Sequence, residues 1–284
     1  MFKAYYQLTK PGIIYGNIIT AAAGFLLASK WHIHWTLLLA TLVGTALVIA
    51  SACVFNNYLD RGIDEKMQRT RHRALVTGTV PIRSAIIYAS LLGAAGFAAL
   101  IIDTNGLVVA IGALAFVDYV ALYGLAKRRS KHGTLVGTIA GAAPLVAGYC
   151  AVTDRFNAGA VILFVIMACW QMSHFYAIAV YRLKDYKAAG LPVWPVEQGL
   201  ASAKRQILGY TLAFLLANLA LSLFGYAGYA YAIIMTLLSL WWLRLAWLGF
   251  QAADDKAWGR QLFLCSLVVI MGLSAMLAVG AILP

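Results

Sequence analysis

The chain reads Asn56-Asn-Tyr-Leu-Asp60-Arg-Gly-Ile-Asp64-Glu-Lys-Met-Gln-Arg-Thr-Arg-His-Arg73 directly after an apolar run, residues 37–55, that is long enough to cross a bilayer. Asn56, Asp60 and Asp64 are four residues apart, so on a helix their side chains stack on one face, about 6 Å apart along the axis. Oxygen ligands at this spacing suit Mg²⁺, which takes one or two carboxylates and completes its shell with water or phosphate. The stretch therefore predicts a metal site formed by these three side chains.

Basic side chains surround this stripe. They suit phosphate or carboxylate oxygens, and they are Arg61, Lys66, Arg69, Arg71 and Arg73. A charged turn between two membrane helices is often only a solvated, positively charged loop. Two acids and an amide in one stripe at a helix end favour a functional site, because polar residues at membrane depth are costly. We interpret the stretch as a metal and diphosphate site at a membrane surface.

The composition indicates an all-α, polytopic membrane protein. Hydrophobic residues make up 63% of the 284 residues, charged residues only 11%, and the mean hydropathy is +0.82. This balance excludes a soluble domain. The four cysteines lie in apolar runs without CxxC spacing, so neither a disulfide framework nor a zinc site is indicated.

Apolar segments divide the chain into nine predicted spans. They cover residues 12–29, 36–56, 84–102, 106–125, 134–152, 158–180, 206–224, 227–249 and 261–283. The loops after the second and sixth spans are both long and basic, and polar residues precede both. This echo predicts one intramembrane domain, 1–284, whose halves, 1–132 and 133–284, face a single central cavity that opens to the cytoplasm.

Lysine and arginine residues are distributed unequally between alternate loops. With the N-terminus inside, 20 of the 22 basic residues fall on the inner side, and only Lys30 and Arg155 remain outside. The positive-inside rule then predicts a cytoplasmic N-terminus and a periplasmic C-terminus. It also explains the net charge of +12 without a nucleic-acid partner. The beginning of the chain resembles neither a signal peptide nor a transit sequence, which favours the bacterial inner (plasma) membrane.

A second polar segment begins inside the sixth predicted span. His174 is followed by Tyr181, Arg182 and Asp185. His174, Tyr181 and Asp185 have i, i+7 and i+11 spacing, which predicts a shared helix face. A histidine in a membrane helix often only hydrogen-bonds a neighbouring helix. In this polar context it can also bind a haem iron or move a proton.

Together these motifs resemble the UbiA-type intramembrane prenyltransferase superfamily, and within it the protohaem IX farnesyltransferase (haem O synthase) branch. The resemblance extends from about Tyr5 to Pro195, and its second motif, with His174, is what favours the haem branch. The residues that carry it are Thr9-Lys-Pro-Gly12, Asn56-Asn-Tyr-Leu-Asp-Arg-Gly-Ile-Asp64, Met67-Gln-Arg-Thr70, Gly133-Thr-Leu-Val-Gly137, Trp170-Gln-Met-Ser-His-Phe175 and Tyr181-Arg-Leu-Lys-Asp-Tyr186. The sequence departs from the branch at Gly62, where an acid is common.

The resemblance implies transfer of the farnesyl group of farnesyl diphosphate to a vinyl group of protohaem IX, giving haem O and diphosphate. It implies Mg²⁺ as cofactor, the lipid bilayer as environment, and a haem A synthase or a terminal oxidase assembly as recipient of the product. In that scheme Asn56, Asp60 and Asp64 hold the metal. The expected diphosphate ligands are Arg61, Lys66, Arg69, Arg73, Lys127 and Arg128.

The acceptor site is less closely defined by the same scheme. His174 is expected to face the haem, and Tyr181 or Asp185 to orient the water that adds to the new side chain. Arg182, Lys184 or the 127–131 cluster can bind the propionates. The alternatives are another UbiA-type enzyme acting on an aromatic or quinone precursor, and a membrane transporter. A transporter would more often place ionisable residues across the midplane than at one side.

Overall fold

The computed structural model describes residues 1–280 and 283, and all secondary structure in these residues is helical. Nine helices in this part of the chain are long and apolar enough to cross a membrane, which confirms the predicted fold class. Helices suit a bilayer because each one satisfies its own backbone N–H and C=O groups.

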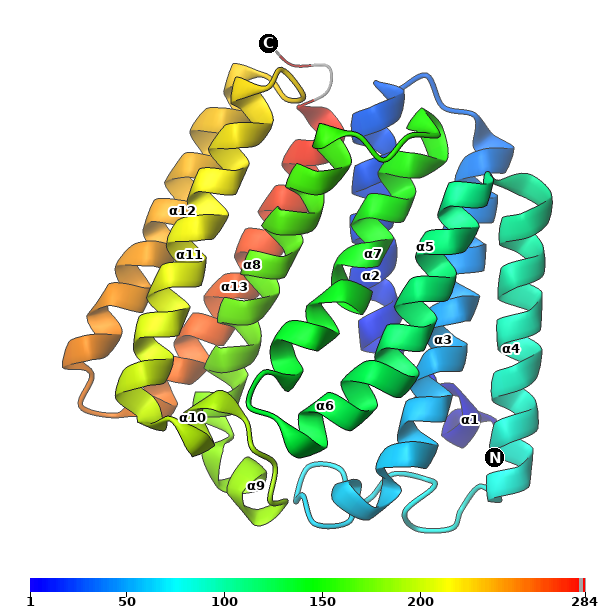
Figure 1. Ribbon diagram of the computed structural model, residues 1–284, viewed down its shortest axis with the longest axis vertical. Helices are drawn as coiled ribbons and strands as arrows, with labels where there is room; N and C mark the ends of the chain where they lie inside the picture. The colour runs from blue at the N-terminus through cyan, green and yellow to red at the C-terminus, as the bar shows by residue number, and fades with distance from the viewer. Residues whose placement is uncertain (281–282, 284) are drawn as a thin grey trace.

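The spanning helices follow one another along the chain, and the two long connections between them, 65–81 and 182–198, lie at one end of the bundle (Figure 1). The fourth span consists of α5 (Gly106–Val117), a π-helical turn η1 (Asp118–Leu122) and α6 (Tyr123–Arg129). The others are α2 (Pro11–Ser29), α3 (Trp35–Asp64), α4 (Ile82–Asp103), α7 (Gly133–Thr153), α8 (Ala158–Tyr181), α11 (Gly199–Leu223), α12 (Tyr229–Leu248) with the turn η2 (Gly249–Gln251), and α13 (Asp255–Val279).

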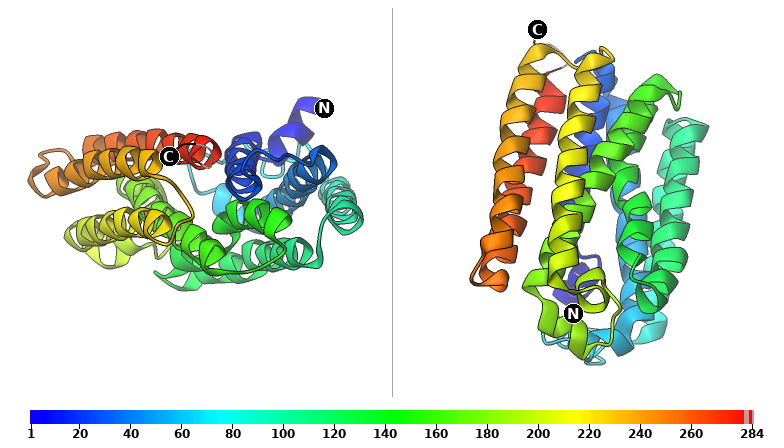
Figure 2. Two further views of the ribbon diagram at one scale, coloured as in Figure 1. Left: turned by 90° about the horizontal axis from the view of Figure 1, so that it is seen from above. Right: turned by 60° about the vertical axis from the view of Figure 1, so that its left-hand side comes forward.

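Three short helices lie at one end of the bundle, together with the segment 65–81 and the end of α6 (bottom of Figure 1). We call this end the polar end. The short helices are α1 (Phe2–Leu8), α9 (Leu183–Ala188) and α10 (Trp194–Glu197). Seen from above (Figure 2, left), α2 to α4 lie on one side and α11 to α13 on the other, with α7 and α8 between them.

The helix ends differ from the sequence prediction where polar residues are buried inside the bundle. The second predicted span, 36–56, continues as α3 to Asp64, because the polar side chains of its last two turns face the interior and not lipid. The ninth predicted span, 261–283, is shifted to Asp255–Val279, since the Asp254 carboxylate caps α13 at the N–H groups of Lys256 and Ala257. Residues 281 and 282 of that prediction lie outside the described residues.

Helices α2 and α7 are in backbone contact away from the polar end. A Cβ added to Gly24 would lie 2.1 Å from the carbonyl oxygen of Leu145, and one added to Gly148 would lie 1.9 Å from that of Ala21. Only glycine allows the two backbones to approach this closely. This contact joins the two halves of the chain and leaves no gap between α2 and α7 at this level of the bundle.

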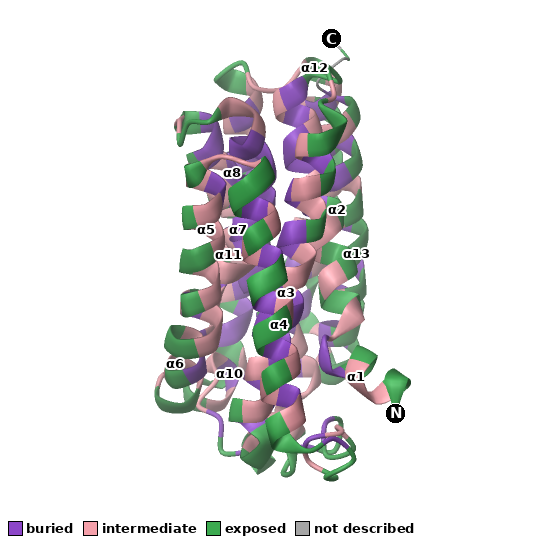
Figure 3. Ribbon diagram, turned by 90° about the vertical axis from the view of Figure 1, so that its right-hand side faces the viewer, coloured by how far each residue is buried: buried purple, intermediate pink, exposed green. Residues whose placement is uncertain are grey.

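The outer faces of the helices carry exposed apolar side chains along their length, as the green bands in Figure 3 show. Leu91 on α4, Leu114 on α5 and Leu237 on α12 are each more than 60% exposed. Such a surface is unfavourable in water and suits lipid chains. The largest buried cluster lies among α7, α8, α11, α12 and α13, so the second half of the chain packs around α8.

Candidate active site

One cavity of about 760 Å³ lies among α2, α3, α6, α7, α8 and α13, so helices from both halves of the chain line it. Its deeper wall is mostly apolar, and its charged side chains come from segments near the polar end. Five of these are basic and two are acidic; they are Lys10, Arg69, Arg73, Lys127 and Lys131, with Asp60 and Asp64.

The stripe of α3 lies on the wall of this cavity. Asn56, Asp60 and Asp64 are 2%, 6% and 5% exposed, and all three lie on one uninterrupted helix. The prediction that they stack on a single helix face is confirmed, since α3 ends only at Asp64. Three oxygen-bearing groups therefore face a largely apolar chamber.

Each member of the stripe is bonded to a basic side chain from another part of the chain. The Lys10 ammonium donates to Asn56 Oδ1 at 2.7 Å, and Arg73 Nη1 donates to Asp64 Oδ2 at 2.7 Å. Lys127 forms an ion pair with Asp60. Basic side chains thus neutralise the carboxylates of the stripe, and the same side chains are suitable donors to phosphate oxygens.

Two further contacts fix this arrangement. Arg73 Nη1 also donates to Asn57 Oδ1 at 3.0 Å, and Asn57 Nδ2 donates to the carbonyl of Leu8 at 2.8 Å. Arg128 reaches the outer side of the stripe, where Nη2 donates to Asp60 Oδ1 at 3.1 Å and to the carbonyl of Leu59 at 2.6 Å. These bonds tie segment 65–73, α1 and α6 to the end of α3.

Lys10 is a residue of this site that the sequence analysis did not select. It precedes α2 in a left-handed conformation with φ 53° and ψ 64°. This geometry turns its side chain into the cavity, where burial lowers the pKa of the ammonium to about 8. A nearby sequence signal was the Thr9-Lys-Pro-Gly12 motif, but its spacing gives no hint of contact with Asn56.

The donor set of the stripe fits a hard divalent cation. No group of three or more His, Cys, Asp or Glu side chains gathers within the described part of the chain, so the third oxygen must come from the Asn56 amide. In the described part of the chain Asn56 Nδ2 has no hydrogen-bond partner, and the other amide atom, Oδ1, accepts a hydrogen bond from the Lys10 ammonium. Carboxylate and amide oxygens are ligands that Mg²⁺ accepts. Asn56, Asp60 and Asp64 are thus the residues that can hold such an ion.

His174 lies on the wall of the same cavity, on α8. Its Nδ1 is 2.7 Å from Ser266 Oγ on α13, and Ser266 Oγ donates its own hydrogen to the carbonyl of Phe263. The serine must then accept from His174, which assigns the proton to Nδ1 and a lone pair to Nε2. Trp170 stacks on the imidazole with ring centroids 4.5 Å apart. The lone pair at Nε2 can accept a hydrogen bond or bind a metal.

Two tyrosines from the fourth span also line the cavity and were not selected from the sequence. The rings of Tyr119 and Tyr123 stack with centroids 5.7 Å apart and an interplanar angle of 22°. The Lys127 ammonium lies 4.9 Å from the Tyr123 centroid. The π-helical turn widens the helix at this point, and simple 3.6-residue periodicity does not predict it.

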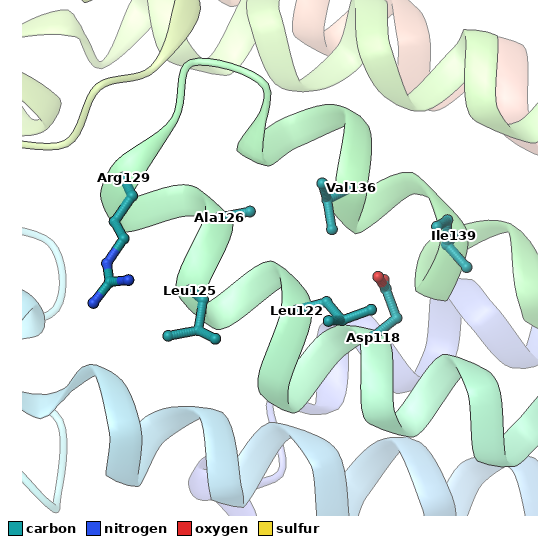
Figure 4. Close-up of a pocket in the computed structure, with 7 residues that line it drawn as sticks. All are labelled: Asp118, Leu122, Leu125, Ala126, Arg129, Val136 and Ile139. Atoms are coloured by element: carbon teal, nitrogen blue, oxygen red, sulfur yellow. The ribbon is translucent and has the colours of Figure 1, made fainter.

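The same turn forms a shallow groove between α6 and α7, shown in Figure 4. Asp118 points from this turn toward α7, and its Oδ2 accepts from the N–H of Ala140 at 3.2 Å. The other carboxylate oxygen is buried without a partner among the described residues. The contact fastens the π-helical turn to α7, behind the cavity tyrosines.

Several predicted site residues lie outside the cavity lining. The prediction of one helix face for His174, Tyr181 and Asp185 is wrong, because α8 ends at Tyr181 and Asp185 belongs to α9. Five other predicted residues do not line the cavity, although Arg128 bonds to Asp60 from outside it. They are Arg61, whose guanidinium lies 4.7 Å from the Tyr58 ring; Lys66; Arg128; Arg182, which lies 4.5 Å from the Tyr181 ring; and Lys184.

Known proteins share this sequence and this arrangement of helices. The model of the UbiA prenyltransferase family matches residues 17–268. The protoheme IX farnesyltransferase of Klebsiella pneumoniae is 52% identical, with 100% of this chain and 97% of that protein aligned. That of Shigella flexneri is also 52% identical, over 100% of this chain and 96% of its own length.

Solved structures agree at the level of the fold. A digeranylgeranylglyceryl phosphate synthase superposes with a TM-score of 0.81 at 17% identity, covering 99% of this chain and 98% of its own. A UbiA homologue from Archaeoglobus fulgidus bound to GPP and Mg²⁺ superposes with a TM-score of 0.75 at 16% identity, covering 97% and 99%. With a family model that spans most of its length, the chain belongs to the UbiA prenyltransferase family.

Proposed function

We propose that this protein transfers the farnesyl group of farnesyl diphosphate to a vinyl group of protohaem IX and so makes haem O and diphosphate. The observation that carries the proposal is the buried oxygen stripe of α3, which faces basic side chains at the polar end of an apolar cavity. The full-length similarity to protoheme IX farnesyltransferases supports the choice of substrates.

The diphosphate binds among Lys10, Arg73 and Lys127. In the protein without substrate, these three side chains bond to oxygen atoms of the stripe. When a diphosphate binds, they can bond to its oxygens in place of those partners. Asn56, Asp60 and Asp64 would then hold Mg²⁺, which would supply Lewis-acid stabilisation of the negative charge on the diphosphate. A solved relative with the same fold is bound to GPP and Mg²⁺, which supports a prenyl diphosphate and a divalent cation as ligands.

The reaction breaks the allylic C–O bond, and the bonding electrons leave with the diphosphate. The farnesyl carbocation takes the π electrons of the haem vinyl group to form the new C–C bond. Water then adds to the cationic vinyl carbon and loses a proton, which gives the hydroxyl of haem O. The apolar wall of the cavity excludes other water until the C–C bond has formed.

His174 faces the haem in this proposal. It lies deeper than the stripe's basic partners and stacks against Trp170, so a flat, apolar macrocycle suits its surroundings. The Nε2 lone pair can contact the haem iron or a bound water. Tyr181 and Asp185 lie outside the cavity lining, so neither is assigned to the water in this proposal.

The test uses purified protein with farnesyl diphosphate, protohaem IX and Mg²⁺. Haem O and diphosphate should appear in equal amounts, as measured by chromatography of extracted haems and by a phosphate assay. If diphosphate were released only when an aromatic or quinone precursor is supplied, that precursor and not haem would be the acceptor. Substrate movement across a vesicle without diphosphate release would contradict the enzymatic proposal altogether.

We also propose that the polar end faces the cytoplasm of a bacterium, with the enzyme in the inner membrane. Most basic residues outside the spans lie at this end. A reporter fused at Lys187 should be cytoplasmic, and one inserted at Asp154 should be periplasmic. The opposite pattern would reverse the assignment. A haem A synthase or a terminal oxidase assembly is the proposed recipient of the product.

A further inference from the structure

Two basic side chains of the cavity are not used by the oxygen stripe. Lys10, Arg73 and Lys127 each bond to a member of the stripe, but Arg69 and Lys131 form no ion pair with any carboxylate of the described residues. Both nevertheless line the cavity. A cavity that already neutralises its two acids therefore keeps two further cations for something else.

The surplus exceeds what a donor substrate requires. Five basic side chains line the cavity against two carboxylates. A diphosphate whose charge is partly neutralised by a divalent cation leaves positive charge unmatched, and unmatched charge in a low-dielectric cavity is costly. A second substrate that brings carboxylates would remove this imbalance.

Arg69 and Lys131 both lie near the segment 186–194 at the cavity mouth. The Lys131 ammonium lies 5.1 Å from the ring centroid of Trp194 on α10. Segment 65–73, which carries Arg69, packs through Met67 against Leu191, so Arg69 lies where this segment meets the 186–194 segment. The two cations thus lie at the mouth of the cavity, where the segments 65–73 and 186–194 are in contact.

The beginning of α7 adds donors beside Lys131. His132 provides no side-chain cap to this helix, and the N–H groups of Thr134 and Leu135 have no hydrogen-bond acceptor among the described residues. Thr134 lines the cavity. Free N–H groups in the first turn of a long helix favour a carboxylate that is already held by a neighbouring cation.

We propose that Lys131 and Arg69 bind the two carboxylates of the acceptor at the cavity mouth, and that Lys10, Arg73 and Lys127 are left for the diphosphate. This rests on the proposed function, which supplies an acceptor with two propionates. It orients the macrocycle with its propionate edge toward the mouth and its opposite edge toward the deep wall. The vinyl groups then face inward, where the farnesyl chain lies.

The experiment compares protohaem IX with its dimethyl ester, in which the propionates are neutral. Lys131→Met and Arg69→Met are titrated with each haem by absorbance in the same detergent, without farnesyl diphosphate. Each variant should bind protohaem at least tenfold more weakly than the parent protein and the ester equally well. Lys131→Arg should restore most of the affinity, and Lys187→Met, an exposed basic residue away from the lining, should change neither.

Binding of the ester also shows that each variant is folded. An equal loss for acid and ester, or no loss for either, overturns the proposal. A raised KM for farnesyl diphosphate with unchanged haem binding overturns it too, and assigns the residue to the donor. If the variants bind protohaem more weakly and the ester equally well, but the parent protein makes no haem O, the carboxylate site is supported and the proposed farnesyl transfer is contradicted.

Discussion

Replacing Asp60 with asparagine removes a proposed metal ligand and, in the same step, the partner of a buried lysine. The side chains of Asp60 and Lys127 are only 9% and 13% exposed. Removing one partner of a buried ion pair costs about 3–5 kcal/mol, because the other charge stays buried. The contact with Arg128, which is 40% exposed, adds at most about 1 kcal/mol. Asp60→Asn should therefore lower the free energy of unfolding by about 3–5 kcal/mol.

Stability and catalysis can be separated with a second variant. Asp60→Asn combined with Lys127→Met buries no unpaired charge and should recover most of the lost stability, measured by denaturation in detergent. Turnover should not recover, because the proposed metal ligand Asp60 is still missing and the proposed diphosphate ligand Lys127 has been removed as well. A loss of about 4 kcal/mol at the transition state is roughly a thousandfold in kcat. Haem O production near the parent level in either variant would refute the metal assignment.

Three further predictions concern the framework and the acceptor side. Gly148→Ala should lower the free energy of unfolding by about 1–3 kcal/mol, because the added Cβ would clash with a carbonyl oxygen of α2. The control Gly209→Ala, at a position with open space around it, should not destabilise the protein. His174→Ala should raise the KM for haem and leave that for farnesyl diphosphate unchanged; an unchanged haem dependence with intact kcat would exclude contact with the acceptor. Asp118→Leu should lower the free energy of unfolding by about 1 kcal/mol, because it removes the side-chain hydrogen bond to the Ala140 N–H, and Asp118→Asn should keep that bond. Equal stability of the two Asp118 variants would contradict this account.

Periodicity and hydropathy were enough to predict the spans and the stacked oxygen stripe. Both depend on local spacing: an apolar run long enough for a bilayer, and three polar residues separated by four. Such spacing fixes which residues share a face of one helix. It does not fix which residue of another helix lies opposite.

The partners of the stripe illustrate that limit. Lys10 reaches Asn56 across 46 residues of sequence, and it does so only because its own backbone is left-handed before α2. Tyr119 enters the cavity through a π-helical turn that no apolar pattern marks. The second motif failed for the opposite reason. A regular spacing suggested that the helix continues, and the chain turned at Arg182 instead.

The contact between α2 and α7 has a consequence for the length of the isoprenoid that fits. Along α2 the cavity lining runs from Gly12 to Thr20, about 12 Å at the rise of an α-helix, and the next turn meets α7 at Gly24. The stop behind the chain on this side is main chain, with no side chain to shorten. Trimming bulky residues on α2 or α7 therefore cannot admit a longer donor along this path. A longer tail would have to leave sideways into lipid or force the two helices apart.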